Sequence, residues 1–207
     1  MRSATKGFTP PLTDQITEEF GQNPFLILIS CLLSLRAKDS VTIRVSTDLF
    51  KVAKTPQAIL ALPLKRLEKI IYQIGFYKNK SKTIHSVCKV LIDKYDGKVP
   101  KTKEELLSIK GIGQKTANLV LGKAYGIPAI CVDVHVHRIS NRLGLIKTKT
   151  PEQTEEALEK ILPKKDWIEW NELLVKWGQN VCAPISPHCN TCKISNYCKK
   201  VGITKHR

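Results

Sequence analysis

Four cysteines close to the C-terminal end of the sequence have the most distinctive chemistry in the chain. They follow the spacing C-x6-C-x2-C-x5-C and are Cys182, Cys189, Cys192 and Cys198. Four thiolates this close together can ligate one metal centre, either an iron–sulfur cube or a structural zinc ion. Two disulfides are the alternative, but disulfides persist in oxidising compartments, and no apolar stretch that would mark a secretory signal follows Met1. The spacing therefore predicts a metal centre in a cytoplasmic protein.

The charge of the chain indicates the kind of partner. Among 207 residues, 34 are Lys or Arg and 18 are Asp or Glu, which gives a net charge of +16, and the basic residues are spread along the whole sequence. A broad basic surface favours a nucleic-acid backbone as the partner. The longest apolar stretch, Phe25–Leu35, has 11 residues, whereas a helix needs about 20 to span a bilayer. We therefore expect nucleic acid as the partner and no membrane.

A glycine turn between two predicted helices is a candidate phosphate site. In the stretch LLSIKGIGQKTA, Gly111 and Gly113 flank Ile112 immediately before a helix. Two glycines allow a tight turn and leave backbone N–H groups uncovered beside a helix N-terminus, where a phosphate can approach. An ordinary helix–helix corner with a glycine cap fits the same residues. The glycines alone do not separate the two interpretations.

Helices must position these groups, because helix-start signals recur along the chain. A capping residue precedes proline at Asn23-Pro24, Thr55-Pro56 and Thr150-Pro151, and Thr102 with Glu105 has capping-box spacing. No Asn-Gly or Asp-Gly pair joins alternating apolar runs, so hairpins of strands are not indicated. The sequence predicts an all-α protein with helices near 13–20, 24–35, 39–50, 56–60, 64–74, 80–95, 103–109, 114–125, 134–143, 151–162 and 166–180. Buried positions in or near these helices are expected for Cys31, Cys88 and Cys131.

Several motifs in a fixed order resemble one known family. They are LLSLRAKDS at 32–40, IGFYKNKSKTI at 74–84, IKGIGQKTANLVLGKAYGIPAICVDVHVHRISNR at 109–142 and the cysteine loop at 182–198. Together they closely resemble the endonuclease III family of helix-hairpin-helix DNA glycosylases over nearly the whole chain. The resemblance implies a six-helix barrel domain at residues 21–130, with the helix-hairpin-helix motif at about 103–125. It also implies a discontinuous second domain, residues 1–20 plus 131–207, whose four cysteines hold a [4Fe–4S] cluster, with DNA in the cleft between the domains.

The resemblance also assigns a catalytic pair, Lys115 in GIGQKTA and Asp133 in VDVH. An amine attacks the anomeric carbon of a damaged nucleotide only when it is neutral, and the positive end of a helix dipole at the first turn disfavours the ammonium form. The carboxylate can accept a proton or offset positive charge on the sugar as the base leaves. A lysine at this position forms a Schiff base, which makes the expected enzyme bifunctional, with an AP-lyase step after base removal. The target base must be extruded from the duplex.

Two further residues match family positions that contact DNA. Phe76 stands where the family has an apolar wedge, although core packing fits it equally well. Arg36 stands where the family has a glutamine that faces the orphaned base, and it favours guanine; a phosphate contact or an ion pair is the alternative. Lys80, in the same segment as Phe76, is a third expected DNA contact.

These observations predict a base-excision repair enzyme that acts on double-stranded DNA carrying damaged pyrimidines or abasic sites. It would be a monomer in the cytoplasm, associated with the nucleoid. Two alternatives stay open at this point: a mismatch-specific monofunctional glycosylase, which Lys115 disfavours, and a non-catalytic DNA-binding protein, which would have no use for the Lys115 and Asp133 pair.

Overall fold

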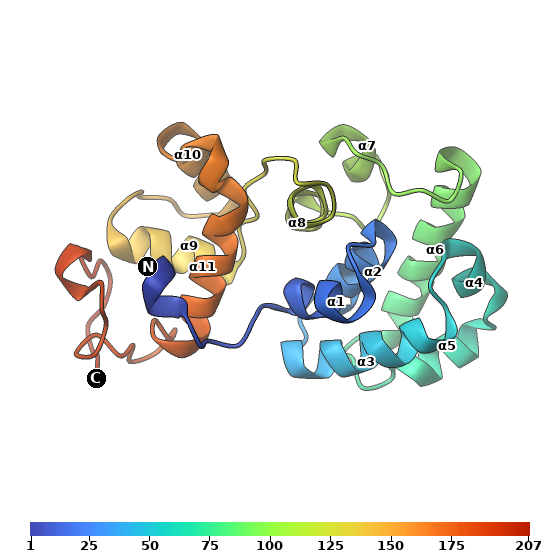
Figure 1. Ribbon diagram of the computed structural model, residues 1–207, viewed down its shortest axis with the longest axis horizontal. Helices are drawn as coiled ribbons and strands as arrows, with labels where there is room; N and C mark the ends of the chain where they lie inside the picture. The colour runs from blue at the N-terminus through green and yellow to red at the C-terminus, as the bar shows by residue number, and fades with distance from the viewer. The chain divides into compact units, whose positions relative to one another are not determined.

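The computed structural model describes residues 1–207 and is entirely helical, with no strand (Figure 1). The all-α prediction is confirmed, and each predicted helix is present. The α-helices are α1 (Leu12–Phe20), α2 (Pro24–Ser34), α3 (Asp39–Val52), α4 (Pro56–Ala61), α5 (Leu64–Ile71), α6 (Tyr77–Tyr95), α7 (Lys103–Ser108), α8 (Gln114–Tyr125), α9 (Val134–Leu143), α10 (Pro151–Ile161) and α11 (Trp167–Asn180). Short 3-10 helices are η1 (Arg2–Thr5), η2 (Lys164–Asp166) and η3 (Ser195–Tyr197).

The helices begin where the capping chemistry predicts. The side chain of Asn23 accepts hydrogen bonds from Phe25 N and Leu26 N at the start of α2. Thr55 and Thr150 each accept one at the starts of α4 and α10, in both cases before a proline at the first helical position. These caps satisfy backbone N–H groups that have no partner inside the helix.

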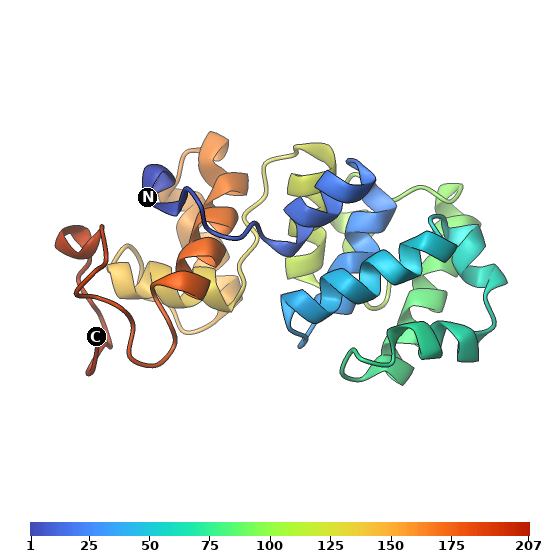
Figure 2. The ribbon, with the colours of Figure 1, turned by 60° about the horizontal axis from the view of Figure 1, so that its bottom comes forward.

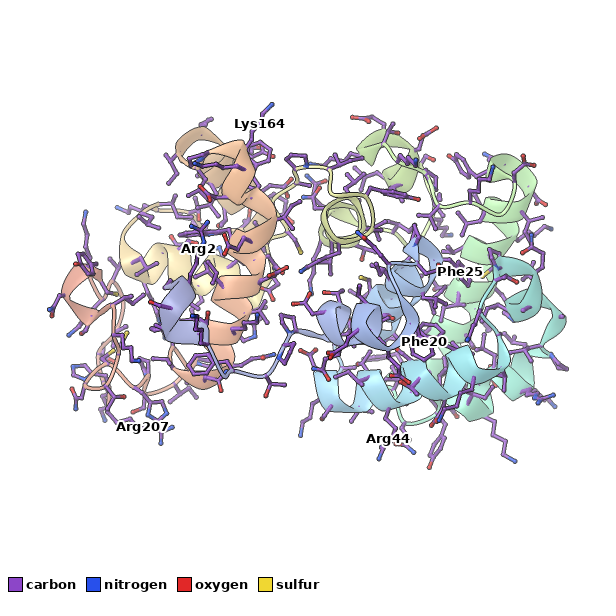
Figure 3. The ribbon with its side chains drawn as sticks, viewed as in Figure 1. Arg2, Phe20, Phe25, Arg44, Lys164 and Arg207 are labelled. Atoms are coloured by element: carbon purple, nitrogen blue, oxygen red, sulfur yellow. The ribbon has the colours of Figure 1, made fainter.

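The chain forms two compact units, residues 12–127 and residues 1–11 plus 128–207. In the first, here called the helical unit, the apolar helix α2 packs against α1, α3, α6 and α8, while α6 also packs against α4 and α5 (Figure 2). Nine of the 11 residues of α2 are buried. Phe25, labelled in Figure 3, lies in this core, and Phe20 of α1 meets Phe50 edge-on at 5.5 Å between ring centroids.

The boundary of the helical unit differs from the expected 21–130. Helix α1 belongs to this unit rather than to the cysteine-bearing one, because its apolar side is buried against α2 and α3: Ile16 is 0% exposed and Leu12 is 6% exposed. An ion pair of 2.7 Å between Lys123 Nζ of α8 and Asp14 Oδ1 adds a polar link within the unit.

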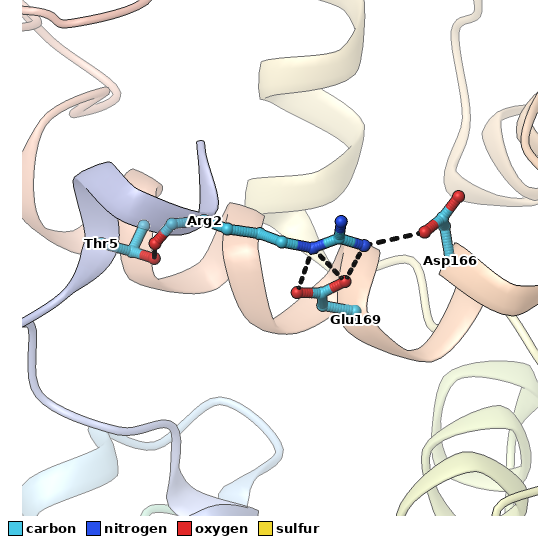
Figure 4. Close-up of polar contacts among 4 residues, drawn as sticks. All are labelled: Arg2, Thr5, Asp166 and Glu169. Carbon is cyan, nitrogen blue, oxygen red and sulfur yellow. Dashed lines mark hydrogen bonds and ion pairs between the residues drawn. The ribbon is translucent and has the colours of Figure 1, made fainter.

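The second unit, here called the cysteine unit, has its own apolar core. Buried residues of α9, α10 and α11 form it together with residues of the segment before α9, and they are Ile130, Val132, Val136, Ile139, Leu158, Leu174 and Trp177. The N-terminal segment packs on this core through Phe8, whose ring lies 6.2 Å from that of Trp177. Figure 4 shows the polar side of this attachment, where the Arg2 guanidinium donates to Glu169 Oε1 at 2.7 Å and to Asp166 Oδ1 at 2.9 Å.

None of the helices combines the length and the apolar character that crossing a membrane would require.

Candidate nucleic-acid interface and metal centre

The glycine turn joins α7 to α8 and uses its two glycines differently. Gly111 has φ of +104°, and an added Cβ would lie 2.5 Å from Thr83 Cγ2 of α6, so both the backbone conformation and the packing require glycine there. Gly113 has an ordinary φ of −99° as the N-cap of α8, and no atom lies within 4 Å of the position of an added Cβ. The fold therefore explains Gly111, whereas Gly113 is exposed and has open space at the position of its Cβ. Ile112 is buried between them.

Lys115 lies in the first turn of α8, two residues after Gly113, and is half-buried. Helix α8 packs on α2, which carries the buried thiol of Cys31. Burial raises the pKa of Cys31 to about 12, and the positive charge of Lys115 acts in the opposite direction. The predicted interior positions of Cys31, Cys88 and Cys131 are confirmed.

Asp133 is the N-cap of α9. Its Oδ1 accepts hydrogen bonds from His135 N and Val136 N, each of 2.9 Å. Both contacts are made by one oxygen, so the capping role leaves Oδ2 of the carboxylate for other work. Asp133 belongs to the cysteine unit and Lys115 to the helical unit.

Arg36 and Phe76 lie together in the helical unit, on two tight turns. Both are non-glycine residues in the left-handed region, with φ of 55° and 59°. The guanidinium carbon of Arg36 lies 6.0 Å from the centroid of the Phe76 ring. Phe76 is 63% exposed, which excludes the core-packing alternative, and Arg36 is exposed as well. The structure thus presents a cation and an aromatic ring side by side on the surface.

Lys80 does not lie where we expected it. Its side chain is buried, with 9% of the residue exposed, and Nζ donates to Leu33 O at 2.7 Å and to Leu35 O at 2.6 Å. Helix α2 ends at Ser34, so carbonyls near its end lack hydrogen-bond donors inside the helix. The Lys80 ammonium donates to two of these carbonyls. Burial lowers the pKa of Lys80 to about 8. The expected direct DNA contact by this side chain is therefore replaced by an internal one.

Four free cysteines line one cavity in the cysteine unit, and they are Cys182, Cys189, Cys192 and Cys198. Apolar side chains of Ile139, Trp177 and Ile194 line the same cavity. N–H groups point at two of the sulfur atoms: Arg142 Nη1 lies 3.4 Å from Cys182 Sγ and Lys200 N lies 3.4 Å from Cys198 Sγ. No three His, Cys, Asp or Glu side chains converge closely enough to hold a single metal ion.

Two arginines one helical turn apart on α9 secure this loop, and the sequence analysis missed both. Arg138 Nη2 donates to Cys182 O at 2.9 Å. Arg142 donates to Ala183 O at 2.6 Å and to Pro184 O at 2.7 Å. Burial lowers the pKa of Arg138. Their i, i+4 spacing after Asp133 was a usable signal, because it places two cations on one helix face.

The comparison with protein families gives the class of the protein. Residues 29–164 match the family described as HhH-GPD superfamily base excision DNA repair protein. That match covers more than half of the chain. The chain belongs to this superfamily of helix-hairpin-helix repair proteins and, on the following similarities, to its endonuclease III family.

Endonuclease III of Thermotoga maritima is 43% identical over 193 residues, which is 91% of this chain and 91% of that protein. Endonuclease III of Escherichia coli is 36% identical, over 88% of this chain and 87% of that protein. A solved structure of a trapped endonuclease III–DNA covalent intermediate matches with a TM-score of 0.82 and 37% identity, over 91% of this chain and 92% of that chain. The family predicted from the sequence motifs is confirmed.

Proposed function

We propose that this protein is a bifunctional DNA N-glycosylase and AP lyase of base-excision repair that acts on damaged pyrimidines in double-stranded DNA. The observation that carries the proposal is a lysine, Lys115, in the first turn of the helix that follows the open glycine turn. High-coverage similarity to endonuclease III, including structures of that enzyme with DNA, supports it. The net charge of +16 suits a polyanionic substrate.

Lys115 is the nucleophile in this proposal. Its neutral amine attacks the anomeric carbon of the extruded nucleotide, the bond to the base breaks, and the base leaves with a proton. Loss of the ring oxygen bond then gives a Schiff base between the lysine and the opened sugar. Removal of a proton from the neighbouring sugar carbon expels the 3′ phosphate, and water finally releases the lysine. The N-terminal end of α8 positions the amine beside the site where the hairpin receives a phosphate.

Asp133 supplies the carboxylate. Its Oδ1 is occupied by the two N–H groups at the start of α9, which fixes the orientation of the side chain. Its Oδ2 can accept a proton from the attacking amine or offset the positive charge that develops on the sugar. Orientation by a helix cap and reactivity at the second oxygen are compatible roles for one carboxylate.

Two surfaces of the helical unit contact DNA in this proposal. The N–H of Gly113 and its neighbours in the glycine turn bind a phosphate, because nothing else occupies the space beside Gly113. Phe76 and Arg36 enter the base stack that the extruded nucleotide leaves, with the ring filling the gap and the guanidinium facing the unpaired base. A guanidinium recognises guanine through O6 and N7.

The cysteine cavity holds a [4Fe–4S] cluster in this proposal. Four thiolates are a ligand set for such a cluster, and N–H donors at Cys182 and Cys198 suit sulfur atoms that carry negative charge. All four cysteines line the same cavity, so one group could bind to all of them. The cluster would order the loop after α11, and the chemistry proposed for Lys115 and Asp133 does not pass through it.

Trapping of the covalent intermediate tests the proposed activity. Incubation with abasic-site duplex and borohydride should give a stable protein–DNA adduct, because borohydride reduces a Schiff base. Lys115→Ala should give no adduct and no strand cleavage, while its binding to the duplex stays near that of the unchanged protein, since one charge among many is lost. Base release without an adduct in the unchanged protein would instead indicate a monofunctional glycosylase. An adduct that survives in Lys115→Ala would assign the nucleophile to another amine.

A further inference from the structure

The buried ammonium of Lys80 joins two turns that lie far apart in the sequence. It donates to the carbonyls of Leu33 and Leu35, which end helix α2, from a position in the first turn of α6. A cation at a helix C-terminus is favoured by the helix dipole, and the two hydrogen bonds satisfy carbonyls that the helix leaves open. Burial lowers the pKa of Lys80 to about 8. The hydrogen-bond acceptors of its ammonium are two backbone carbonyls and include no carboxylate. These two hydrogen bonds link the first turn of α6 to the end of α2.

On the α2 side, Lys80 holds the turn that carries Arg36. The chain reverses just after Leu35, with Arg36 in the left-handed conformation and a hydrogen bond of 3.0 Å from Ala37 N to Ser34 O. The left-handed conformation is unfavourable for a non-glycine residue, so surrounding contacts must maintain it. The ammonium bound to Leu35 O, adjacent to Arg36, is such a contact.

On the α6 side, the same residue holds the turn that carries Phe76. Lys80 N donates to Phe76 O at 3.0 Å, and Phe76 is also left-handed. The two turns touch, since an added Cβ at Gly75 would lie 3.8 Å from Arg36 O and the guanidinium lies over the Phe76 ring. Lys80 therefore bonds one turn through its backbone and the other through its side chain.

We infer that Lys80 is a positioning residue that holds the Arg36 turn and the Phe76 turn in one fixed arrangement, so that ring and guanidinium enter the DNA stack as a unit. This inference rests on the proposed function, in which the Phe76 and Arg36 side chains insert into the base stack of DNA. Loss of the ammonium does not change the side chains of Phe76 and Arg36, but it removes the hydrogen bonds that link their two turns. The consequence is specific: recognition of a gap in the duplex suffers, whereas nonspecific attraction to phosphates and the chemistry of Lys115 do not.

Lys80→Met tests the inference, because methionine keeps an unbranched apolar stem without the ammonium. Lys89→Met is the matched control, since Lys89 is exposed on the same helix and its replacement removes the same charge. We would measure the ratio of Kd values for undamaged and abasic-site duplexes in the unchanged protein, Lys80→Met, Lys89→Met, Phe76→Ala and the double variant Lys80→Met/Phe76→Ala. Lys80→Met should lower the ratio by about tenfold, within the range of couplings between contacting residues. The double variant should match Phe76→Ala, and Lys89→Met should match the unchanged protein.

A single-stranded abasic oligonucleotide separates positioning from general damage to the fold. It has no opposing strand and no stack to fill, so the rate of borohydride trapping on it should be the same in Lys80→Met and the unchanged protein. Equal losses on single-stranded and duplex substrates, or additive effects of Lys80→Met and Phe76→Ala, would overturn the inference. If Lys80→Met unfolds below the assay temperature, the cycle uses Lys80→Gln, which retains an N–H donor but cannot reach both carbonyls. Absence of trapping in the unchanged protein would refute the proposed function itself rather than the role of Lys80.

Discussion

The helical unit and the loop of residues 181–207 are stabilised in different ways. Nine of 11 residues in α2 are buried, and apolar side chains of its neighbours complete a continuous core. In the loop, Pro187 is the one buried residue, while Ile185 is 86% exposed and Tyr197 is 85% exposed. Apolar burial stabilises the first region, at roughly 25 cal/mol per Å² of area removed from water. In the second region this source of stability is smaller, because only a few side chains, such as Val181 and Ile194, are partly buried against the core of the cysteine unit.

Polar contacts hold the loop instead. Arg138 and Arg142 bind its carbonyls, and carbonyls at the end of α9 accept hydrogen bonds from Val201 N and Lys199 N. Such contacts contribute about 1 kcal/mol each, and they depend on one arrangement of the partners. The comparison teaches that apolar burial is the main source of stability in the helical unit, whereas polar contacts carry more of it in the loop, where the proposed cluster would add to them.

The largest expected effect is that of removing one thiol. Cys192→Ser should abolish cluster binding, so that amide hydrogens of residues 181–207 exchange rapidly while those of the helical unit stay protected. Anaerobically purified unchanged protein should be yellow-brown with about four irons per chain. Hydrogen exchange read by mass spectrometry, with iron analysis, checks both expectations.

Cys88→Ser provides the opposite control. Cys88 is fully buried in α6, so a hydroxyl there should destabilise the helical unit and leave the iron content unchanged. If Cys192→Ser also made the amide hydrogens of the helical unit exchange rapidly, the contrast between the helical unit and the loop would be wrong. A colourless unchanged protein with one zinc ion would refute the cluster.

Asp133→Asn tests the role proposed for a carboxylate of the cysteine unit. Asparagine is as good an N-cap as aspartate, so α9 should keep its start and the melting temperature should change little. Loss of the charged acceptor should slow adduct formation about 10²- to 10⁴-fold in single-turnover assays. Asp133→Ala, which also loses the cap, should lower the free energy of unfolding by a further ~1 kcal/mol. An Asp133→Asn rate within a factor of two of the unchanged protein would remove Asp133 from the mechanism.

Gly113→Val tests the phosphate site in the helical unit. The Cβ meets no protein atom, so the cost to folding should be limited to the loss of a better N-cap residue, about 1 kcal/mol, but a β-branched side chain would cover the space for a phosphate. Binding to damaged and undamaged duplexes should weaken equally, roughly tenfold, as expected for one lost charge-assisted hydrogen bond. Gly111→Val should instead destabilise the fold through Thr83. A Gly113→Val defect confined to damaged DNA would contradict the phosphate role.

Arg36→Gln addresses the opposite base. If the guanidinium pairs with O6 and N7 of an orphaned guanine, excision in the unchanged protein should be faster opposite guanine than opposite adenine, by about 1–3 kcal/mol in transition-state free energy. Arg36→Gln should reduce that preference and leave trapping by Lys115 intact. Single-turnover rates that are equal opposite all four bases in the unchanged protein would leave Arg36 as a backbone contact.

A further test concerns pH and Lys80. Its pKa is about 8 in the folded protein against an ordinary 10.5, so between these values the unfolded chain binds more protons than the folded one. The free energy of unfolding of the unchanged protein, relative to Lys80→Met, should therefore rise as the pH rises from 8 to 10.5. Urea unfolding of both proteins across that range measures the difference. A difference that is constant or falls with pH would mean that the ammonium is not destabilised by burial.

Local chemistry in the sequence determined the helices and the identity of the family. Asn23-Pro24, Thr55-Pro56 and Thr150-Pro151 predicted helix starts correctly, because capping involves residues two or three positions apart. The segment between α5 and α6 was less accurate: α6 begins at Tyr77 rather than near 80, since a left-handed Phe76 caps it. The four cysteines were identifiable from spacing alone, and they line a single cavity.

Tertiary structure alone decided which partners the buried polar groups have. Helical periodicity places Lys80, unlike its exposed neighbours Lys78 and Lys82, on the buried face of α6, but its partners are carbonyls of a helix end about 45 residues away. The same holds for Arg138 and Arg142, whose partners lie about 40 residues further along the chain. The assignment of α1 to the helical unit is another case, since its apolar side fits α2 and α3 in space. Spacing determines what lies within one turn, whereas the partner of a buried charge depends on how distant segments pack.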